Sequence, residues 1–146
     1  MPERETLQRA QEDAREGKSP STQAGEFVRE EIHHIREGKH GARSAQQAIA
    51  IGLSKARRAG VKLSAPTGPA SIRHKAAQDI RAAKKKSGAK KSVTRSRAVE
   101  AALQRESSNA ASHAALSRQA KKSSTKRGRE RLQQAALKAA RTHKAA

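Results

Sequence analysis

The chain has 146 residues with no cysteine and a single Phe, Tyr or Trp residue, and its formal net charge at pH 7 is +20. The charge is uneven, because residues 1–40 hold 7 Lys or Arg against 9 Asp or Glu, whereas residues 41–146 hold 26 against 4. This composition excludes disulfides, thiolate metal sites and cysteine nucleophiles, and no apolar stretch is long enough to span a membrane.

Large apolar residues are few and concentrated in one part of the chain. Only 18 of the 146 residues are Leu, Ile, Val or Phe, and nine of them fall between Phe27 and Leu63. We therefore expect the hydrophobic core in that segment. So small a core is expected to be marginal alone and to need the preceding helix, a second copy or a ligand.

Residues 1–20 are predicted to form a polar helix over residues 3–16, followed by a break. Leu7 is the one large apolar residue of this helix, so the helix can pack against a neighbour but is not stable alone. The next helix begins either with Ser19 as its cap and Pro20 at its first position, or slightly later with one of the two hydroxyl residues that follow.

Residues 21–63 are predicted to form a helix–loop–helix module. Its first helix carries Val28, Ile32 and Ile35 on one apolar face. Gly38 follows the last turn of this helix, and a glycine there is typical of a left-handed C-terminal cap.

The second helix of the module is predicted over Ala45–Ala59, with Ser44 as its N-terminal cap. Its apolar residues recur on one face and most are Ala or Gly, so a partner helix can approach closely. Ile51 lies at the edge of that face, where it can meet the first helix or another subunit. Gly60 followed by Val61 is typical of a Schellman stop.

The rest of the chain is predicted to be a proline-containing linker with a basic helix, residues 64–92, and an Ala/Lys/Arg-rich tail, residues 93–146. From Ser64 to the end, 21 residues are Ala and 21 are Lys or Arg, against 4 acidic residues. Alanine favours helix, whereas mutual repulsion keeps the free chain open. The expected fold class is therefore mainly α, with a small helix–loop–helix module, a preceding helix and a long basic tail that is disordered or loosely helical.

This surplus of cations indicates binding to a polyanion, because Lys and Arg that neutralise phosphates release counterions whatever the base sequence. One Phe provides no platform on which single-stranded bases stack, so duplex DNA is the favoured partner, with structured RNA as an alternative. An anionic membrane surface is less suited, since the apolar faces here are mostly Ala. A solvated tail that only keeps the protein soluble is the remaining alternative. The residues predicted to contact phosphates are Arg57, Arg58, Lys62, Lys84, Lys85, Lys86, Lys90, Lys91, Arg95, Arg97, Lys121, Lys122, Lys126, Arg127 and Arg129.

The helix–loop–helix module has a second interpretation, as a helix-turn-helix that reads bases. Gln46 and Gln47, near the start of the second helix, would then pair with adenine edges. However, the loop from Gly38 to Arg43 is longer and richer in glycine than the usual tight turn, and the cations gather at the other end of the helix. We therefore prefer a packed hairpin that presents its C-terminal cations to phosphates.

No pattern in the sequence predicts a metal, a cofactor or an enzyme. His33, His34 and His40 are neighbours, but the first two lie about 100° apart on a helix and the spacing matches no recognised zinc pattern. We expect exposed helix histidines. There is no glycine loop for a nucleotide, no set of nucleophile, base and orienting residue, and no carboxylate pair that we expect to be buried.

The segment Gln47–Gly60, QAIAIGLSKARRAG, resembles a box found in small, basic, uncharacterised bacterial proteins. These proteins also tend to carry a stretch like EFVREEIHHIREGKHG, which is Glu26–Gly41 here, and an Ala/Lys/Arg-rich extension. The resemblance covers residues 21–63 closely and the remainder in composition. The resemblance implies a bacterial host and a histone-like protein, and it assigns no functional-site residues.

The sequence thus favours sequence-independent, histone-like DNA binding by phosphate neutralisation. Since the N-terminus has no apolar segment typical of a secretory signal, we expect a cytoplasmic protein of the bacterial nucleoid. One alternative is a protein-interaction adaptor that docks a partner through Phe27, Ile51 and the neighbouring apolar surface of the 21–63 hairpin. Another is a basic protein associated with RNA or the ribosome. Homo-oligomer formation through the 21–63 module also stays open.

Overall fold

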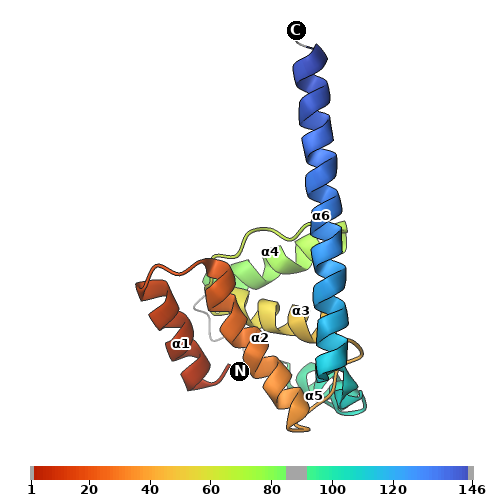
Figure 1. Ribbon diagram of the computed structural model, residues 1–146. Coiled ribbons are helices and arrows are strands. Elements are labelled where there is room, and N and C mark those ends of the chain that lie inside the picture. The colour runs from red at the N-terminus through yellow and green to blue at the C-terminus, as the bar shows by residue number, and fades with distance from the viewer. Residues whose placement is uncertain (1, 85–91, 145–146) are drawn as a thin grey trace. The chain divides into compact units, whose positions relative to one another are not determined.

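The computed structural model describes residues 2–84 and 92–144, and every regular element in this part of the chain is a helix (Figure 1). The elements are α1 (Arg4–Arg15), α2 (Pro20–Arg36), α3 (Ala45–Arg58), α4 (Ala70–Lys84), α5 (Val93–Gln104), the 3-10 helix η1 (Ser108–Ala111) and α6 (His113–Lys144). The predicted mainly α fold class is confirmed. Among the described residues, no helix combines the length and the apolarity that crossing a membrane requires.

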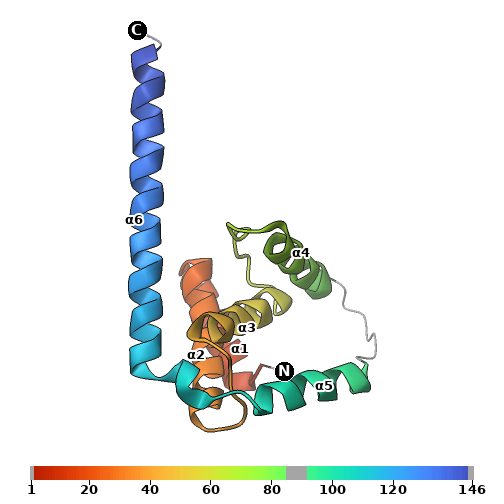
Figure 2. The same ribbon diagram turned by 90° about the vertical axis from the view of Figure 1, so that its right-hand side faces the viewer.

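The chain forms two units, residues 1–112 and residues 113–146. In the first unit, α2 packs against both α1 and α3, and α4 packs against α3. The short helix η1 contacts α2 and α3, and Figure 2 shows it next to the loop that joins these two helices. The second unit contains the single helix α6.

Serine hydroxyls begin both helices of the helix–loop–helix module. Ser19 Oγ accepts a hydrogen bond from Thr22 N–H (3.3 Å), and Pro20 is the first residue of α2. Ser44 Oγ accepts a hydrogen bond from Gln47 N–H (3.2 Å) at the start of α3. The cap predicted at Ser44 is confirmed, and of the two alternatives for α2 the structure selects Ser19.

Glycines in the left-handed backbone region end the same two helices. The φ angle is +75° at Gly38 and +98° at Gly60, a region that side-chain-bearing residues rarely adopt. After Gly60, Val61 N–H donates to Ala56 O (3.1 Å), and after Gly38, Lys39 N–H donates to His34 O (3.0 Å). These bonds define Schellman motifs, so both predicted stops are confirmed.

A first hydrophobic cluster lies where α1, α2 and α3 meet. Its buried members are Ala10, Ala24, Phe27 and Ala56, and Leu7, Leu53, Val61 and Leu63 pack against them. Phe27 is the largest of these side chains and is 1% exposed. Through Leu7 and Ala10, the polar helix α1 obtains the apolar contact that it needs to be stable.

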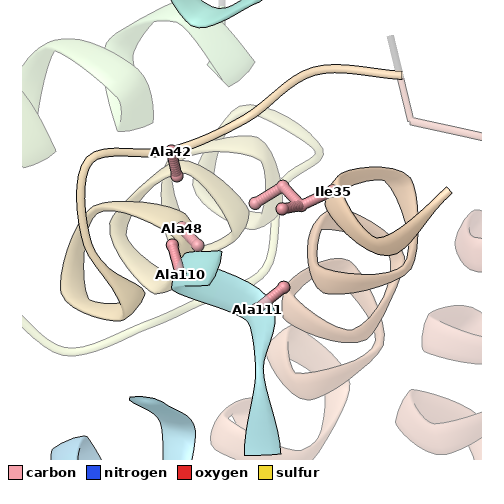
Figure 3. Packing of buried hydrophobic residues seen from close by; sticks show 5 residues of the cluster. All are labelled: Ile35, Ala42, Ala48, Ala110 and Ala111. Atoms are coloured by element: carbon pink, nitrogen blue, oxygen red, sulfur yellow. The ribbon is translucent and has the colours of Figure 1, made fainter. Parts of the chain in front are cut away.

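A second cluster joins α2 and α3 to η1 (Figure 3). Its buried members are Ile35, Ala42, Ala48, Ala110 and Ala111, and Ile32 packs against them. Ala110 and Ala111 lie far outside the segment in which the sequence placed the core. That expectation was too narrow, because these alanines share the composition of the basic region around them.

Hydrogen bonds also join η1 and the end of α5 to α2 and the loop that follows it. Gly41 N–H donates to Leu103 O (2.9 Å), and Arg36 Nε donates to Ala111 O (2.9 Å). A Cβ atom at Gly41 would collide with the main chain at Glu106. The chain between α5 and η1 is therefore built into the folded unit that contains the helix–loop–helix module.

Helices α2 and α3 approach each other closely at Gly52. A Cβ atom there would lie 2.7 Å from the Cα atom of Val28. Three alanines of α3 are buried on the same face as Gly52. The small-residue face predicted for this helix is confirmed, and it allows the two backbones to come together.

Candidate nucleic-acid interface

The cations at the end of α3 lie next to a buried carboxylate of α4. The side chain of Asp79 is 4% exposed and accepts a hydrogen bond from the hydroxyl of Ser54. Arg58 Nε lies 3.5 Å from Asp79 Oδ1, and Lys75 Nζ lies 3.3 Å from the same oxygen. Asp79 therefore neutralises part of the charge that α3 was predicted to present to phosphates.

Arg57 and Lys62, the other two candidates in this region, differ in exposure. Arg57 is half-buried and lines a hollow of about 350 Å³ between α3 and α4, together with Ile72. Its Nε is buried and has no hydrogen-bond partner among the described residues. Lys62 is exposed. Of this group, Lys62 is the cation most open to a phosphate.

The next candidates fall around the link between α4 and α5. Lys84 in the last turn of α4 is exposed, and so are Arg95 and Arg97 on α5. The residues of this group that lie outside the described part of the chain are Lys85, Lys86, Lys90 and Lys91.

Helix α6 carries exposed cations in a regular row. The five candidates on it are all exposed: Lys121, Lys122, Lys126, Arg127 and Arg129. Together with the exposed Arg118, three of them follow the spacing i, i+4, i+8 and i+11, which places four cations on one face. We call Arg118, Lys122, Lys126 and Arg129 the α6 row. It spans about 16 Å along the helix axis.

One carboxylate accompanies the α6 row. Glu130 is the single acidic residue in the sequence of α6, and its Oε1 lies 3.9 Å from Lys126 Nζ. An exposed pair at this distance contributes little and is easily exchanged for another partner. The α6 row therefore keeps most of its charge available.

Arg9 on α1 and Lys18 in the turn after it are paired with carboxylates instead. Arg9 Nε lies 2.6 Å from Glu26 Oε2, and Lys18 Nζ lies 2.8 Å from Asp13 Oδ1. The hydrogen bonds to these carboxylates raise the pKa of both cations. Lys39 is paired in the same way. The charge free to meet a polyanion thus lies mainly in the later part of the chain.

The two glutamines that a base-reading helix would use have different surroundings. Gln47 is half-buried, and its Oε1 accepts a hydrogen bond from Arg43 N–H (2.8 Å) in the loop before α3. Gln46 is exposed. Gln47 would have to give up this bond before it could pair with a base.

Two adjacent carboxylates of α2 are buried, contrary to the expectation that the chain has no buried carboxylate pair. The side chains of Glu30 and Glu31 are 2% and 1% exposed. Lys55 Nζ on α3 lies 2.6 Å from Glu31 Oε2 and 3.3 Å from Glu30 Oε1. Burial opposes ionisation of Glu30, but hydrogen bonds from Thr6 and from Glu3 N–H, together with the charge of Lys55, outweigh it and lower the pKa of Glu30.

His34 and His40 are close together and partly buried, which corrects the expectation of exposed helix histidines. Their side chains are 13% and 16% exposed, and their ring centroids lie 6.2 Å apart. His33 is 68% exposed, as expected. The helical angle between His33 and His34 was the wrong criterion, because the loop after α2 brings His40 back to the helix. The spacing of Glu31 and His34, three residues apart on one helix face, was the signal available in the sequence.

The adaptor alternative loses one of its two named contacts. Phe27 is 1% exposed and packs inside the first hydrophobic cluster, so it offers no surface to a partner. Ile51 is half-buried.

In comparisons with known proteins, no family model, no curated protein and no solved structure matches this chain.

Proposed function

We propose that this protein binds duplex DNA by neutralising its phosphates, without reading the base sequence and without catalysing a reaction. The α6 row carries the proposal, since it places four exposed cations along one helix face. Phosphates on a nucleic-acid backbone can meet such a row in succession, and each contact releases condensed counterions.

The distribution of charge over the chain supports the same function. Residues 41–146 carry 22 more cations than anions, whereas residues 1–40 carry two more anions than cations. Self-repulsion among unpaired cations is relieved when phosphates lie alongside them. The folded first unit would then position the protein, and the α6 row with Lys62, Lys84, Arg95 and Arg97 would supply affinity. In a bacterial host, such binding would place the protein on the nucleoid.

The test is the salt dependence of binding to a random-sequence duplex, measured by fluorescence anisotropy of the labelled DNA. For six or more phosphate contacts, the association constant should fall about 10³-fold or more between about 50 and 200 mM salt. Replacing the four cations of the α6 row with Gln in the full chain should lower the slope of log K against log salt by about 3 to 4.

A matched control removes the same number of charges from cations that are already paired. The control variant replaces Arg9, Lys18, Lys39 and Lys75, which lie 2.6, 2.8, 3.0 and 3.3 Å from a carboxylate oxygen. Its slope should stay close to that of the unaltered protein. Equal slopes for the two variants would refute the proposal that the α6 row makes the contacts. Stronger competition by structured RNA than by duplex DNA at the same salt would transfer the function to the RNA-associated alternative.

A further inference from the structure

One helix face and one loop bring three metal-binding side chains together in the first unit. Glu31 and His34 are three residues apart on α2, which places them on the same face, and His40 follows in the loop. One donor atom from each residue lies within 4.8 Å of the donor atoms of the other two. The three side chains are shielded from solvent, with exposed fractions of 1%, 13% and 16%.

The main chain orients the ring of His40. Its Nδ1 lies 3.1 Å from the carbonyl oxygen of Gly41, which can only accept a hydrogen bond, so Nδ1 carries the proton. In a neutral ring the lone pair is then on Nε2, and Nε2 lies 3.3 Å from Glu31 Oε1. Either a proton on Nε2 or a bound metal ion can bridge these two atoms. Metal-ligating histidines are held in this way, with one ring nitrogen bonded to a carbonyl and the other left for the metal.

Glu31 has one oxygen available for that cation. Its Oε2 lies 2.6 Å from Lys55 Nζ, whereas its Oε1 faces His40. A carboxylate that is 1% exposed has almost no water to stabilise its charge, so both oxygens require partners from the protein or a bound ion. The Lys55 ammonium group pairs with Oε2 through charge without a hydrogen bond to it, and a metal ion would pair with Oε1.

Glu3 holds His34 from another segment of the chain. Its Oε1 lies 2.8 Å from His34 Nε2, and this hydrogen bond lowers the pKa of the Glu3 carboxyl group. A carboxylate bonded to one ring nitrogen fixes the ring and makes the histidine a better metal ligand. Glu3 N–H in turn donates to Glu30 Oε2 (3.0 Å), so the position of Glu3 is itself fixed.

We propose that Glu31, His34 and His40 form a zinc site. Two imidazole nitrogens and one carboxylate oxygen suit Zn²⁺, whereas Mg²⁺ and Ca²⁺ prefer oxygen ligands alone. In tetrahedral coordination with bonds of about 2.0–2.2 Å, neighbouring donor atoms lie about 3.3–3.5 Å apart. His40 Nε2 and Glu31 Oε1 already have this separation, and a donor atom of His34 lies within 4.8 Å of the other two donor atoms. The ion would fasten the loop after α2 to the helix, and water would take the fourth position.

The experiment is a titration of the full-length, tag-free protein with Zn²⁺ in the absence of DNA, read by isothermal calorimetry. We expect one equivalent to bind tightly and to raise the melting temperature. Loss of even an outer partner of a ligating histidine typically weakens metal binding about 10- to 100-fold. Replacing a ligand, as in His34→Ala or His40→Ala, should therefore weaken binding at least about 100-fold.

His33→Ala is the matched control, because His33 neighbours the site in the sequence but is exposed and pairs with Glu37 (2.8 Å). It should bind Zn²⁺ as the unaltered protein does. If His34→Ala and His40→Ala bind as tightly as His33→Ala, the proposal is overturned, and so it is if the unaltered protein takes up no stoichiometric Zn²⁺. X-ray absorption at the zinc edge needs no variant. Two imidazoles in the first coordination shell support the site, and their absence refutes it.

Discussion

Replacing Lys55 with Met should destabilise the first unit strongly at neutral pH. The ammonium group of Lys55 is the cation between the buried carboxylates Glu30 and Glu31, at 3.3 Å and 2.6 Å. Methionine keeps most of the length of this unbranched side chain but carries no charge. Two adjacent carboxylates would then be buried without their shared partner, which would destabilise the packing of α2 against α3.

The size of the expected loss in folding free energy follows from how deeply the two glutamates and Lys55 are buried. Both glutamate side chains are at most 2% exposed, and that of Lys55 is 18% exposed. Removing one partner of a buried ion pair typically costs about 3–5 kcal/mol. A small domain is stable by about 5–15 kcal/mol in total, so this substitution removes a large part of its stability. In urea, with an m-value of about 2 kcal/mol/M, the midpoint should fall by about 2 M.

Urea denaturation followed by circular dichroism measures this shift, with Lys62→Met as the control. Lys62 is exposed and lies beyond the end of α3, so its loss should change the free energy of unfolding by less than about 0.5 kcal/mol. The loss of stability in Lys55→Met should shrink as the pH falls, because protonation of Glu30 removes part of the uncompensated charge. A Lys55→Met protein as stable at pH 7 as the control would show that the buried pair does not depend on this ammonium group.

Three further substitutions test the packing, the cap and the acid response. Gly52→Ala should destabilise the protein by about 1 kcal/mol, because the new Cβ atom meets the backbone of Val28. Gly25→Ala on α2 has open space around the new Cβ atom and should stabilise the protein by up to about 1 kcal/mol. Melting temperatures that shift in the same direction for both variants would contradict this. Ser44→Ala should cost about 1 kcal/mol through loss of the α3 cap, and an unchanged melting temperature would count against the cap. The lowered pKa of Glu30 adds stability that is complete above the ordinary pKa of 4.5 and is lost as the pH falls through the pKa of the folded state. Glu30→Gln should therefore flatten the acid side of the curve of stability against pH. A curve with the slope of the unaltered protein would refute this.

The helices of the module were predictable because their ends depend on local chemistry. Ser44 and Gly60 act through hydrogen bonds to residues within one turn, so the sequence alone identifies them. Gly52 is similar, since its place on a face of small residues already indicates a close helix contact. These features need no knowledge of the tertiary fold.

The buried charges were not predictable in the same way. Glutamate is almost never buried without a partner, and the partner of Glu31 is Lys55, which is distant in sequence and meets it only after α2 packs on α3. Likewise, the pairing of Arg58 with Asp79 depends on how α4 crosses α3. The exposure of the α6 cations, in contrast, followed from composition, because α6 has only three large apolar residues and so lacks a broad apolar face for burial.

The attachment of the chain after α5 to the loop before α3 has a consequence for synthesis on the ribosome. Gly41 and Ala42 obtain hydrogen-bond acceptors for their main-chain amides from Leu103 and Ser107, more than sixty residues later. A nascent chain that has emerged only as far as α4 therefore lacks the native acceptors of both amides and the alanines that cover Ile35. Completion of the fold must wait for nearly the whole first unit, so ribosome-bound intermediates of this protein should be open to proteases at that loop.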